Sequence, residues 1–173
     1  MVMELAQNGD LFDVVAGVGR LSENTARHFF KQIVEGLDHL HFEHYMCHLD
    51  LKLENILVDE EYNAKITDFG FVKEIQALNN SRQFVGTKGY QCPQIVNKKA
   101  FDGESADVFA LGVVLFSMVF GKKPFHEASS SDKLFHPIFV NNFDAFWSFH
   151  CKQMAGKESF VSNDLKDLIM SML

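Results

Sequence analysis

The residues between His48 and Gly70 carry the side chains of this sequence that are best suited to chemistry. Asp50, Lys52 and Asn55 lie within one short stretch, and Asp68 follows thirteen residues after Asn55. Phosphoryl transfer from ATP requires a carboxylate near the attacking hydroxyl, a cation at the transferred group and oxygen ligands for Mg²⁺. These four side chains have those chemistries. The alternative, a surface loop that happens to contain acidic and amide groups, does not account for their order.

A β-hairpin is the element expected to bring the two halves of this set together. Ile56-Leu57-Val58 and Ala64-Lys65-Ile66 are short apolar runs on either side of the polar turn 59–63. A hairpin here returns the chain to its starting point, so that Asp68 lies near Asn55. Upstream, Ser22 is a good N-cap residue, and apolar residues recur at helical spacing after it, which predicts one long helix from Glu23 to about His44.

The remaining pattern is mainly helical. The expected elements are a buried strand at Met1–Leu5, a short helix at Leu11–Val15, a long loop at Phe71–Tyr90, a buried helix at Asp107–Phe120 and a final helical piece at Asp164–Leu173. The predicted fold class is therefore α+β and mainly α-helical, with a small β-hairpin at the loop that carries Asp50.

Composition narrows the class of protein. The chain of 173 residues is 47% hydrophobic, contains 18 phenylalanines and has a formal net charge of −7, which argues against nucleic-acid binding. Cys47, Cys92 and Cys151 are widely spaced and odd in number, so we expect a reduced, intracellular and cytoplasmic chain. We find no signal peptide, and the apolar run Val108–Phe120 is too short to span a membrane comfortably.

Three segments resemble the eukaryotic serine/threonine protein kinase family. His48-Leu49-Asp50-Leu51-Lys52-Leu53-Glu54-Asn55 with Asp68-Phe69-Gly70 resembles the family's H-R-D-L-K-x-x-N and D-F-G motifs. Gly86-Thr87-Lys88-Gly89-Tyr90-Gln91-Cys92-Pro93-Gln94 resembles its G-T-x-x-Y-x-A-P-E segment. The resemblance covers essentially the whole chain. The segment from Phe135 onward faintly resembles the calcium/calmodulin-dependent and AMP-activated kinase groups.

The resemblance implies a role for each residue of the set. Asp50 would be the catalytic base, and Lys52 would neutralise the γ-phosphoryl group. Asn55 and Asp68 would hold Mg²⁺, and Thr87 would bond the catalytic aspartate and lysine, as is typical of kinases that act on serine or threonine. The implied cofactors are ATP and Mg²⁺.

The resemblance also implies a nucleotide site at the start of the chain. Met3 would lie beside the adenine, the backbone of Glu4 and Ala6 would bond its edge, and Leu57 would pack under the ring. Asp10 would meet the ribose or a basic substrate residue. Asp10 with Glu54 would give at most a moderate preference for protein substrates that are basic upstream of the acceptor. Asp107 matches a position that helps to hold the active geometry in this family, and its carboxylate is expected to accept backbone hydrogen bonds from the loop that carries Asp50.

The sequence departs from the family pattern at several points. No Gly-rich loop, strand lysine or partner glutamate is found, so we expect a partial kinase domain over residues 1–173, formed of the hinge and the C-terminal lobe, with the N-terminal lobe and the extreme C-terminal end missing. Leu49 stands where most members have arginine, and Gln83 occupies the usual phosphorylated position. Gln94 replaces a glutamate. We therefore expect that activity does not require phosphorylation at position 83, and Ser81 is the nearest alternative.

Two functions remain open from the sequence. The first is a serine/threonine protein kinase that transfers the ATP γ-phosphoryl group to protein substrates, of which this chain is a part. The second is a non-catalytic half-kinase that acts as a protein-binding or regulatory module. Retention of the five predicted catalytic residues favours the first.

Overall fold

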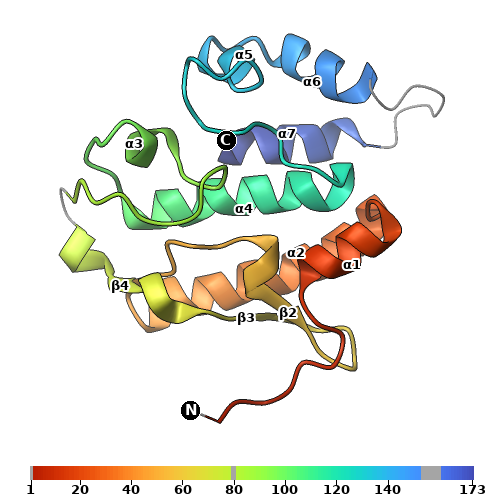
Figure 1. The fold of residues 1–173 in the computed structure, drawn as a ribbon, viewed down its shortest axis with the longest axis vertical. Helices are drawn as coiled ribbons and strands as arrows, with labels where there is room; N and C mark the ends of the chain where they lie inside the picture. Colours follow the sequence, from red (N-terminus) through yellow and green to blue (C-terminus); the bar gives the residue numbers. More distant parts are fainter. Residues whose placement is uncertain (1, 79–80, 153–160) are drawn as a thin grey trace.

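A computed structural model describes residues 2–78, 81–152 and 161–173. Helices dominate it, and two small sheets lie at one side (Figure 1). The helices and strands are α1 (Leu11–Val18), α2 (Glu23–Asp38), β1 (Met46–Cys47), β2 (Ile56–Val58), β3 (Ala64–Ile66), β4 (Lys73–Glu74), α3 (Pro93–Val96), α4 (Gly103–Phe120), α5 (His136–Phe139), α6 (Phe143–Lys152) and α7 (Asn163–Met172). A π-helical turn at His39–Glu43 and 3₁₀ turns at Leu53–Asn55, Phe69–Phe71 and Ile75–Leu78 connect them.

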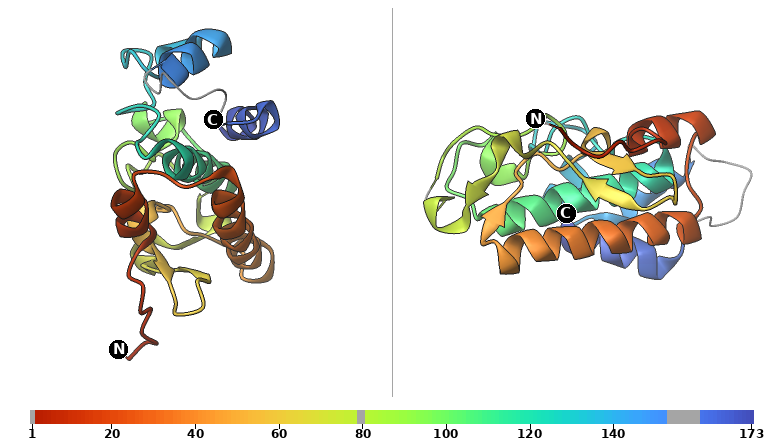
Figure 2. Two further views of the ribbon diagram at one scale, coloured as in Figure 1. Left: turned by 90° about the vertical axis from the view of Figure 1, so that its right-hand side faces the viewer. Right: turned by 90° about the horizontal axis from the view of Figure 1, so that it is seen from below.

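Helix α4 lies at the centre of the core. It packs against α2 on one side and α7 on the other, while α5 and α6 form the end of the molecule farthest from the sheets (Figures 1 and 2). Asp102 caps its N-terminus by accepting a hydrogen bond from the Ser105 amide at 2.8 Å, and Gly121 ends it in a left-handed conformation. Apolar side chains cover all its faces, which is the pattern of a fully buried helix.

The same helix is, among the described residues, the one segment long and apolar enough to cross a membrane by length and composition. Of this stretch, 83% is buried inside the chain. Its apolar surface is therefore already covered by α2, α7 and the phenylalanines of the core. The prediction placed its start at Asp107, and the structure begins it four residues earlier, at Gly103.

Helix α2 begins as the sequence predicts. The Ser22 hydroxyl accepts a hydrogen bond from the Thr25 amide at 3.1 Å, and Phe29, Ile33 and Leu37 line its buried face. The α-helix ends at Asp38, earlier than predicted, and the chain continues through the π-helical turn to Glu43. This turn carries His41 into the core, beneath the N-terminal half of α4.

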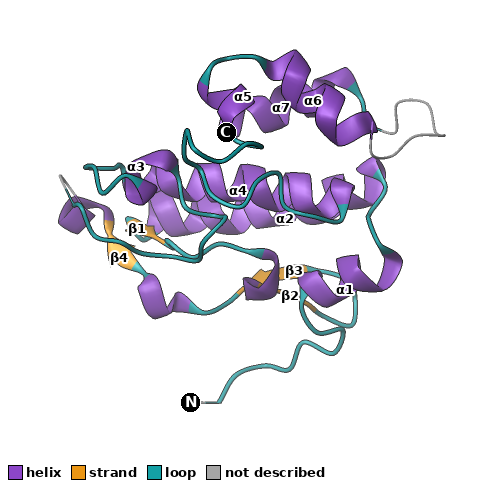
Figure 3. Cartoon of the chain, turned by 45° about the horizontal axis from the view of Figure 1, so that its top comes forward, coloured by secondary structure: helices purple, strands orange, loops and turns teal. Residues whose placement is uncertain are grey.

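The predicted hairpin is present, and it is one of two sheets in the described part of the chain. Strands β2 and β3 pair antiparallel, with Ile56 opposite Ile66. A second antiparallel pair, β1 with β4, matches Cys47 to Lys73 and was not predicted (Figure 3). Strands of two residues are too short to show the alternation of apolar and polar residues from which strands are predicted.

The expected buried strand at the start of the chain is wrong for residues 2–5. Val2, Met3 and Leu5 are exposed, and residues 2–5 form no strand. The chain meets β2 only further on, where the Asn8 amide donates to the Val58 carbonyl at 3.0 Å and the Val58 amide donates to the Gly9 carbonyl at 2.8 Å. An extended segment is buried only where a neighbouring element covers it, and no described element covers residues 2–5.

Candidate active site

The loop between β1 and β2 is held in place by one carboxylate from α4. Asp107 accepts hydrogen bonds from the backbone amides of His48 and Leu49, both at 2.7 Å, as the sequence predicts. Its Oδ2 atom also lies 2.9 Å from Nε2 of His41. All these groups are buried, so the charge of Asp107 is compensated by charge-assisted hydrogen bonds rather than by water.

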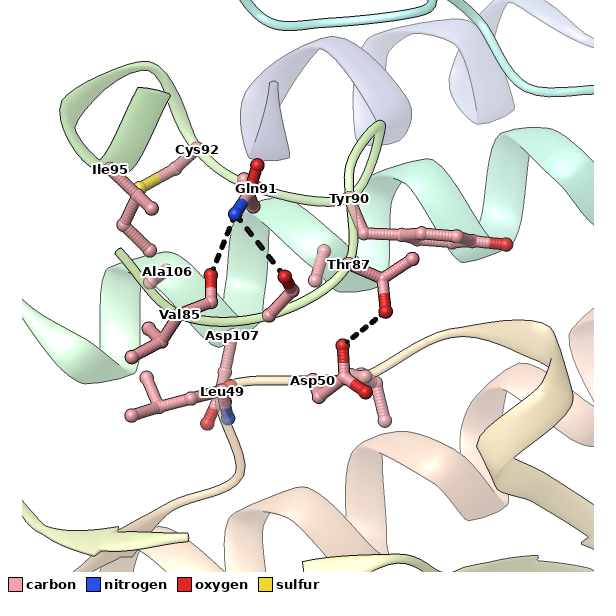
Figure 4. Close-up of a pocket in the computed structure, with 13 residues that line it drawn as sticks. Leu49, Asp50, Val85, Thr87, Tyr90, Gln91, Cys92, Ile95, Ala106 and Asp107 are labelled. Carbon is pink, nitrogen blue, oxygen red and sulfur yellow. Dashed lines mark hydrogen bonds between the residues drawn. The ribbon is translucent and has the colours of Figure 1, made fainter. Parts of the chain in front are cut away.

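Asp50, at the centre of this loop, gathers three of the predicted residues around it. Its Oδ2 lies 2.9 Å from the Lys52 ammonium, and its Oδ1 accepts a hydrogen bond from the Thr87 hydroxyl at 2.7 Å. Lys52 also donates to the Thr87 hydroxyl oxygen at 2.9 Å, which closes a triangle of contacts. The amide nitrogen of Asn55 lies 2.9 Å from the Asp50 carbonyl oxygen and 3.3 Å from Oδ2. Figure 4 shows Thr87 and Asp50 facing each other.

Asp68 is joined to this cluster through the backbone of the hairpin. The loop between β1 and β2, residues 48–55, is called the catalytic loop because it resembles the kinase motif of that name. The Thr67 amide donates to the Asn55 carbonyl at 3.0 Å, so Asp68 follows directly after a residue that contacts this loop. Asp68 itself has a left-handed backbone, with φ 61°, and accepts a hydrogen bond from the Gly70 amide at 3.3 Å. His48 packs edge-on against Phe69, with ring centroids 5.5 Å apart, which fixes the start of the following turn.

Four of the five residues predicted to bind a nucleotide line a separate cavity, together with Asp68. Met3, Glu4, Ala6 and Leu57 all contribute to it, and its volume is about 750 Å³. Lys65 also lines it and lies 3.2 Å from the Glu4 carboxylate, which raises the pKa of that lysine.

Asp10 does not line this cavity. Its side chain instead caps α1 by accepting a hydrogen bond from the Asp13 amide at 2.8 Å. The Asp10 carboxylate is therefore already used to cap α1. A ribose or a basic substrate residue, as predicted, would compete with the Asp13 amide for it.

Two further residues at the site were not singled out from the sequence. Gln91 is buried, and its amide nitrogen donates to the carbonyl oxygens of Val85 and Gly86 (Figure 4). The Tyr90 hydroxyl donates to Glu54 at 3.4 Å, and burial raises the pKa of Tyr90. The sequence signal for Gln91 is a polar residue between Tyr90 and Cys92, which are both buried. This signal does not predict its contacts, because hydrogen bonds from a side chain to a loop backbone follow no periodic pattern.

His41, Cys47 and Asp107 are residue types that bind metal ions, and their potential ligand atoms lie within 4.8 Å of one another. Both carboxylate oxygens of Asp107 are already occupied by His41 and by two backbone amides. Burial, followed by the charge of Asp107, raises the pKa of Cys47 to about 12, which keeps the thiol protonated. His41 and Asp107 therefore belong to a hydrogen-bond network that anchors the catalytic loop, and Cys47 is a buried neutral thiol beside it.

Taken together, the site combines a buried carboxylate, a cation beside it and a hydroxyl that bridges them. The carboxylate can accept a proton from a substrate hydroxyl, and the cation can stabilise charge on a transferred group. The oxygen of the Asn55 side chain is left over after its nitrogen bonds Asp50, and with Asp68 it provides ligands of the type that Mg²⁺ prefers.

Comparison with known proteins agrees with this chemistry. The protein kinase domain family matches residues 1–173. The chain therefore belongs to the protein kinase family, and its relatives place it among the eukaryotic serine/threonine kinases.

Several named relatives are similar over long stretches. A probable serine/threonine-protein kinase MARK-B of Dictyostelium discoideum is 37% identical over 100% of this chain and 23% of its own length. Serine/threonine-protein kinases SAPK7 and SAPK4 of Oryza sativa subsp. japonica are 41% and 35% identical, over 73% and 98% of this chain and 36% and 49% of their own lengths. The chain thus spans less than half the length of these relatives.

The family match corrects one prediction. The sequence led us to expect a fragment made only of the C-terminal lobe, with the N-terminal lobe absent. The match covers residues 1–173 as protein kinase domain, including the segment before α1, and contradicts that description. The inference failed because it was drawn from the point where the chain begins, which does not define the limits of a fold.

Proposed function

We propose that this chain is part of a serine/threonine protein kinase that transfers the γ-phosphoryl group of ATP to serine or threonine residues of protein substrates. The observation that carries the proposal is the triangle formed by Asp50, Lys52 and Thr87, with contacts of 2.7 to 2.9 Å. A loop with no chemical role would not be expected to bury a carboxylate in direct contact with a half-buried ammonium and a half-buried hydroxyl. Phosphoryl transfer uses all three.

Each residue of the cluster has a distinct task in this proposal. Asp50 orients the acceptor hydroxyl and takes its proton, because its carboxylate is buried and already accepts a hydrogen bond from one hydroxyl, that of Thr87. Lys52 supplies positive charge beside the transferred group. Thr87 holds both side chains at the edge of the segment that receives the substrate.

Mg²⁺ and ATP fit the residues that remain. Asn55 and Asp68 would hold Mg²⁺, which neutralises phosphate charge when it is bound. Met3, Glu4, Ala6 and Leu57 would bind the adenine in the cavity that they share with Asp68. Glu54 is exposed near the catalytic loop, and it supports a moderate preference for a basic residue upstream of the acceptor. The three free cysteines support an intracellular, reducing location.

The test is a phosphoryl-transfer assay on the longest product of the gene, with Mg·ATP and serine, threonine and tyrosine peptides. Phosphate on serine or threonine, lost in Asp50→Asn and kept in the exposed control Glu60→Gln, supports the proposal. If the wild type binds Mg·ATP but transfers no more phosphate to the peptides than Asp50→Asn does, the function is that of a protein-binding module. The replacements Leu49 and Gln94 are the features that favour that second candidate.

A further inference from the structure

Gln91 is a buried polar side chain in the segment that carries Thr87. Only 4% of its surface is exposed, and its neighbours Tyr90 and Cys92 are buried as well. A primary amide that is removed from water costs free energy unless its donors and acceptors are paired. The partners of Gln91 therefore indicate what its burial achieves.

Both donors of the Gln91 amide go to the backbone just before Thr87. The Nε2 atom lies 2.9 Å from the Val85 carbonyl oxygen and 3.2 Å from the Gly86 carbonyl oxygen. The opposite orientation of the amide would place its own oxygen against two carbonyl oxygens, so the pair of acceptors fixes the assignment. The Oε1 atom has no hydrogen-bond partner among the described residues, which shows that the donors and not the acceptor hold the side chain there.

These hydrogen bonds close a tight turn around Thr87. Inside the turn, the Tyr90 amide donates to the Thr87 carbonyl at 3.0 Å. The Thr87 hydroxyl makes its bonds to Asp50 and Lys52. The position of this hydroxyl thus depends on the two carbonyls that Gln91 holds.

On its other side, the segment rests directly on the catalytic loop. Gly86 has φ +82°, and a Cβ atom added there would lie 2.5 Å from the Leu49 carbonyl oxygen. Leu49 is buried at this contact. Among the described residues, the charged ones that line the small cavity below the segment are Asp50 and Asp107, and both are already hydrogen-bonded. The Lys52 ammonium does not line this cavity and is already bonded to Asp50 and Thr87, so the lining offers no cation to a phosphate group.

We propose that Gln91 is a positioning residue, which uses neutral hydrogen bonds to hold Thr87 against Asp50 and Lys52 in place of a phosphate-dependent ion pair. The proposal rests on the proposed kinase function. It assigns to Gln91 no contact with substrate or nucleotide.

The main test compares two glutamine substitutions in the longest product of the gene. Gln91→Met keeps the length and volume of the side chain and removes both donors, while Gln76→Met makes the same change at an exposed glutamine. We expect Gln91→Met to lower kcat by about 10- to 100-fold, because a displaced catalytic contact has effects of that order. The KM for Mg·ATP should stay within about threefold, and Gln76→Met should match the wild type.

A double-mutant cycle separates positioning from general destabilisation. If Gln91 acts through the Thr87 hydroxyl, Gln91→Met should add little to the loss of kcat already caused by Thr87→Ala. If the two losses multiply, Gln91 does not act through Thr87 and the proposal is overturned.

A readout without catalysis keeps the proposal distinct from the kinase function. Hydrogen exchange of the backbone amides at 85–90 should be faster in Gln91→Met than in Gln76→Met, with the exchange of α4 unchanged. If the wild type transfers no phosphate but Gln91→Met still speeds hydrogen exchange at 85–90, the proposed kinase function fails. The inference that Gln91 holds the segment before Thr87 then stands. If Gln91→Met changes neither the exchange at 85–90 nor kcat, the proposal that Gln91 is a positioning residue is overturned.

Discussion

Leu49 and Asp107 are linked by a hydrogen bond of 2.7 Å that joins the catalytic loop to the central helix. Leu49 is a non-glycine residue with φ 64°, a left-handed conformation that costs about 1–2 kcal/mol. The neighbouring amide of His48 donates to the other carboxylate oxygen at 2.7 Å. The carboxylate therefore compensates for a strained backbone, and the geometry around Asp50 depends on it.

The first prediction concerns this carboxylate. Asp107→Asn replaces one acceptor oxygen with an amide group that donates, so one of the two backbone amides loses its partner. We expect the free energy of unfolding to fall by about 2–4 kcal/mol, the range for a buried charge-assisted network. Urea denaturation of the chain measures this. Glu60→Gln, the same kind of change at an exposed acid, should leave the midpoint in place, and an equal shift in both would refute the assignment.

The second prediction concerns the close approach at Gly86. Alanine there would combine a positive φ with a Cβ atom 2.5 Å from the Leu49 carbonyl oxygen. Gly86→Ala should therefore destabilise the chain by about 2 kcal/mol or more and displace Thr87 from Asp50.

Gly17 provides the matched control for that change. It lies inside α1, and an added Cβ would meet nothing within 4 Å. Because alanine is the better helix former, Gly17→Ala should raise stability by up to about 1 kcal/mol. Thermal unfolding of both variants measures the contrast. If Gly86→Ala were as well tolerated as Gly17→Ala, the segment would not rest on the catalytic loop as the structure shows.

The cluster around Asp50 could be anticipated from the sequence because its members lie in short motifs with fixed spacing. The structure places Thr87 in contact with Asp50 and Lys52, as the resemblance implied, and it also brings the side chain of Asn55 against Asp50. The position of Asp10 could not be anticipated in the same way. A carboxylate that precedes a helix has two competing partners, the helix amides and a ligand, and the sequence does not decide between them.

The predicted elements show a similar division. Long periodic helices such as α2 and α4 were found, with shifted ends. The two-residue strands β1 and β4 were missed, and residues 2–5 were wrongly predicted as a buried strand. In each failure the local pattern carried too little information, because the environment of a short extended segment is set by elements distant in the sequence.

The third prediction concerns phosphorylation of the segment before Thr87. Gln83 accepts a hydrogen bond from the Lys73 ammonium, so a neutral side chain occupies the position where the family usually carries a phosphate. We expect Ser81→Ala to change kcat by less than about twofold, since ordering of the segment does not depend on an added charge.

The assay for that prediction uses the longest product of the gene before and after phosphatase treatment, with Ser131→Ala, at an exposed serine, as the control. The prediction is wrong if kcat falls strongly in Ser81→Ala and not in Ser131→Ala. It is also wrong if phosphatase treatment lowers kcat of the wild type but not of Ser81→Ala, because the segment would then be switched by a phosphate on Ser81.

The last prediction concerns His150 and acid stability. Its ring is 1% exposed and packs against Phe116, Phe120 and Phe146, and neither ring nitrogen has a hydrogen-bond partner among the described residues. Burial lowers the pKa of His150 from 6.5 to about 4. The folded chain therefore keeps this ring neutral where the unfolded chain protonates it.

The sign of the effect follows from this difference. Above pH 6.5 the ring is neutral in both states and pH has no effect through this group. As pH falls from 6.5 towards 4, the unfolded state binds a proton that the folded state does not, so stability is lost, by about 2 kcal/mol between pH 7 and pH 5. In His150→Phe this part of the pH dependence should disappear, whereas His126→Gln, at an exposed histidine, should retain it. Urea denaturation of the three proteins at pH 7 and pH 5 measures the difference, and an equal loss in His150→Phe and the wild type would mean that His150 is not buried in its neutral form.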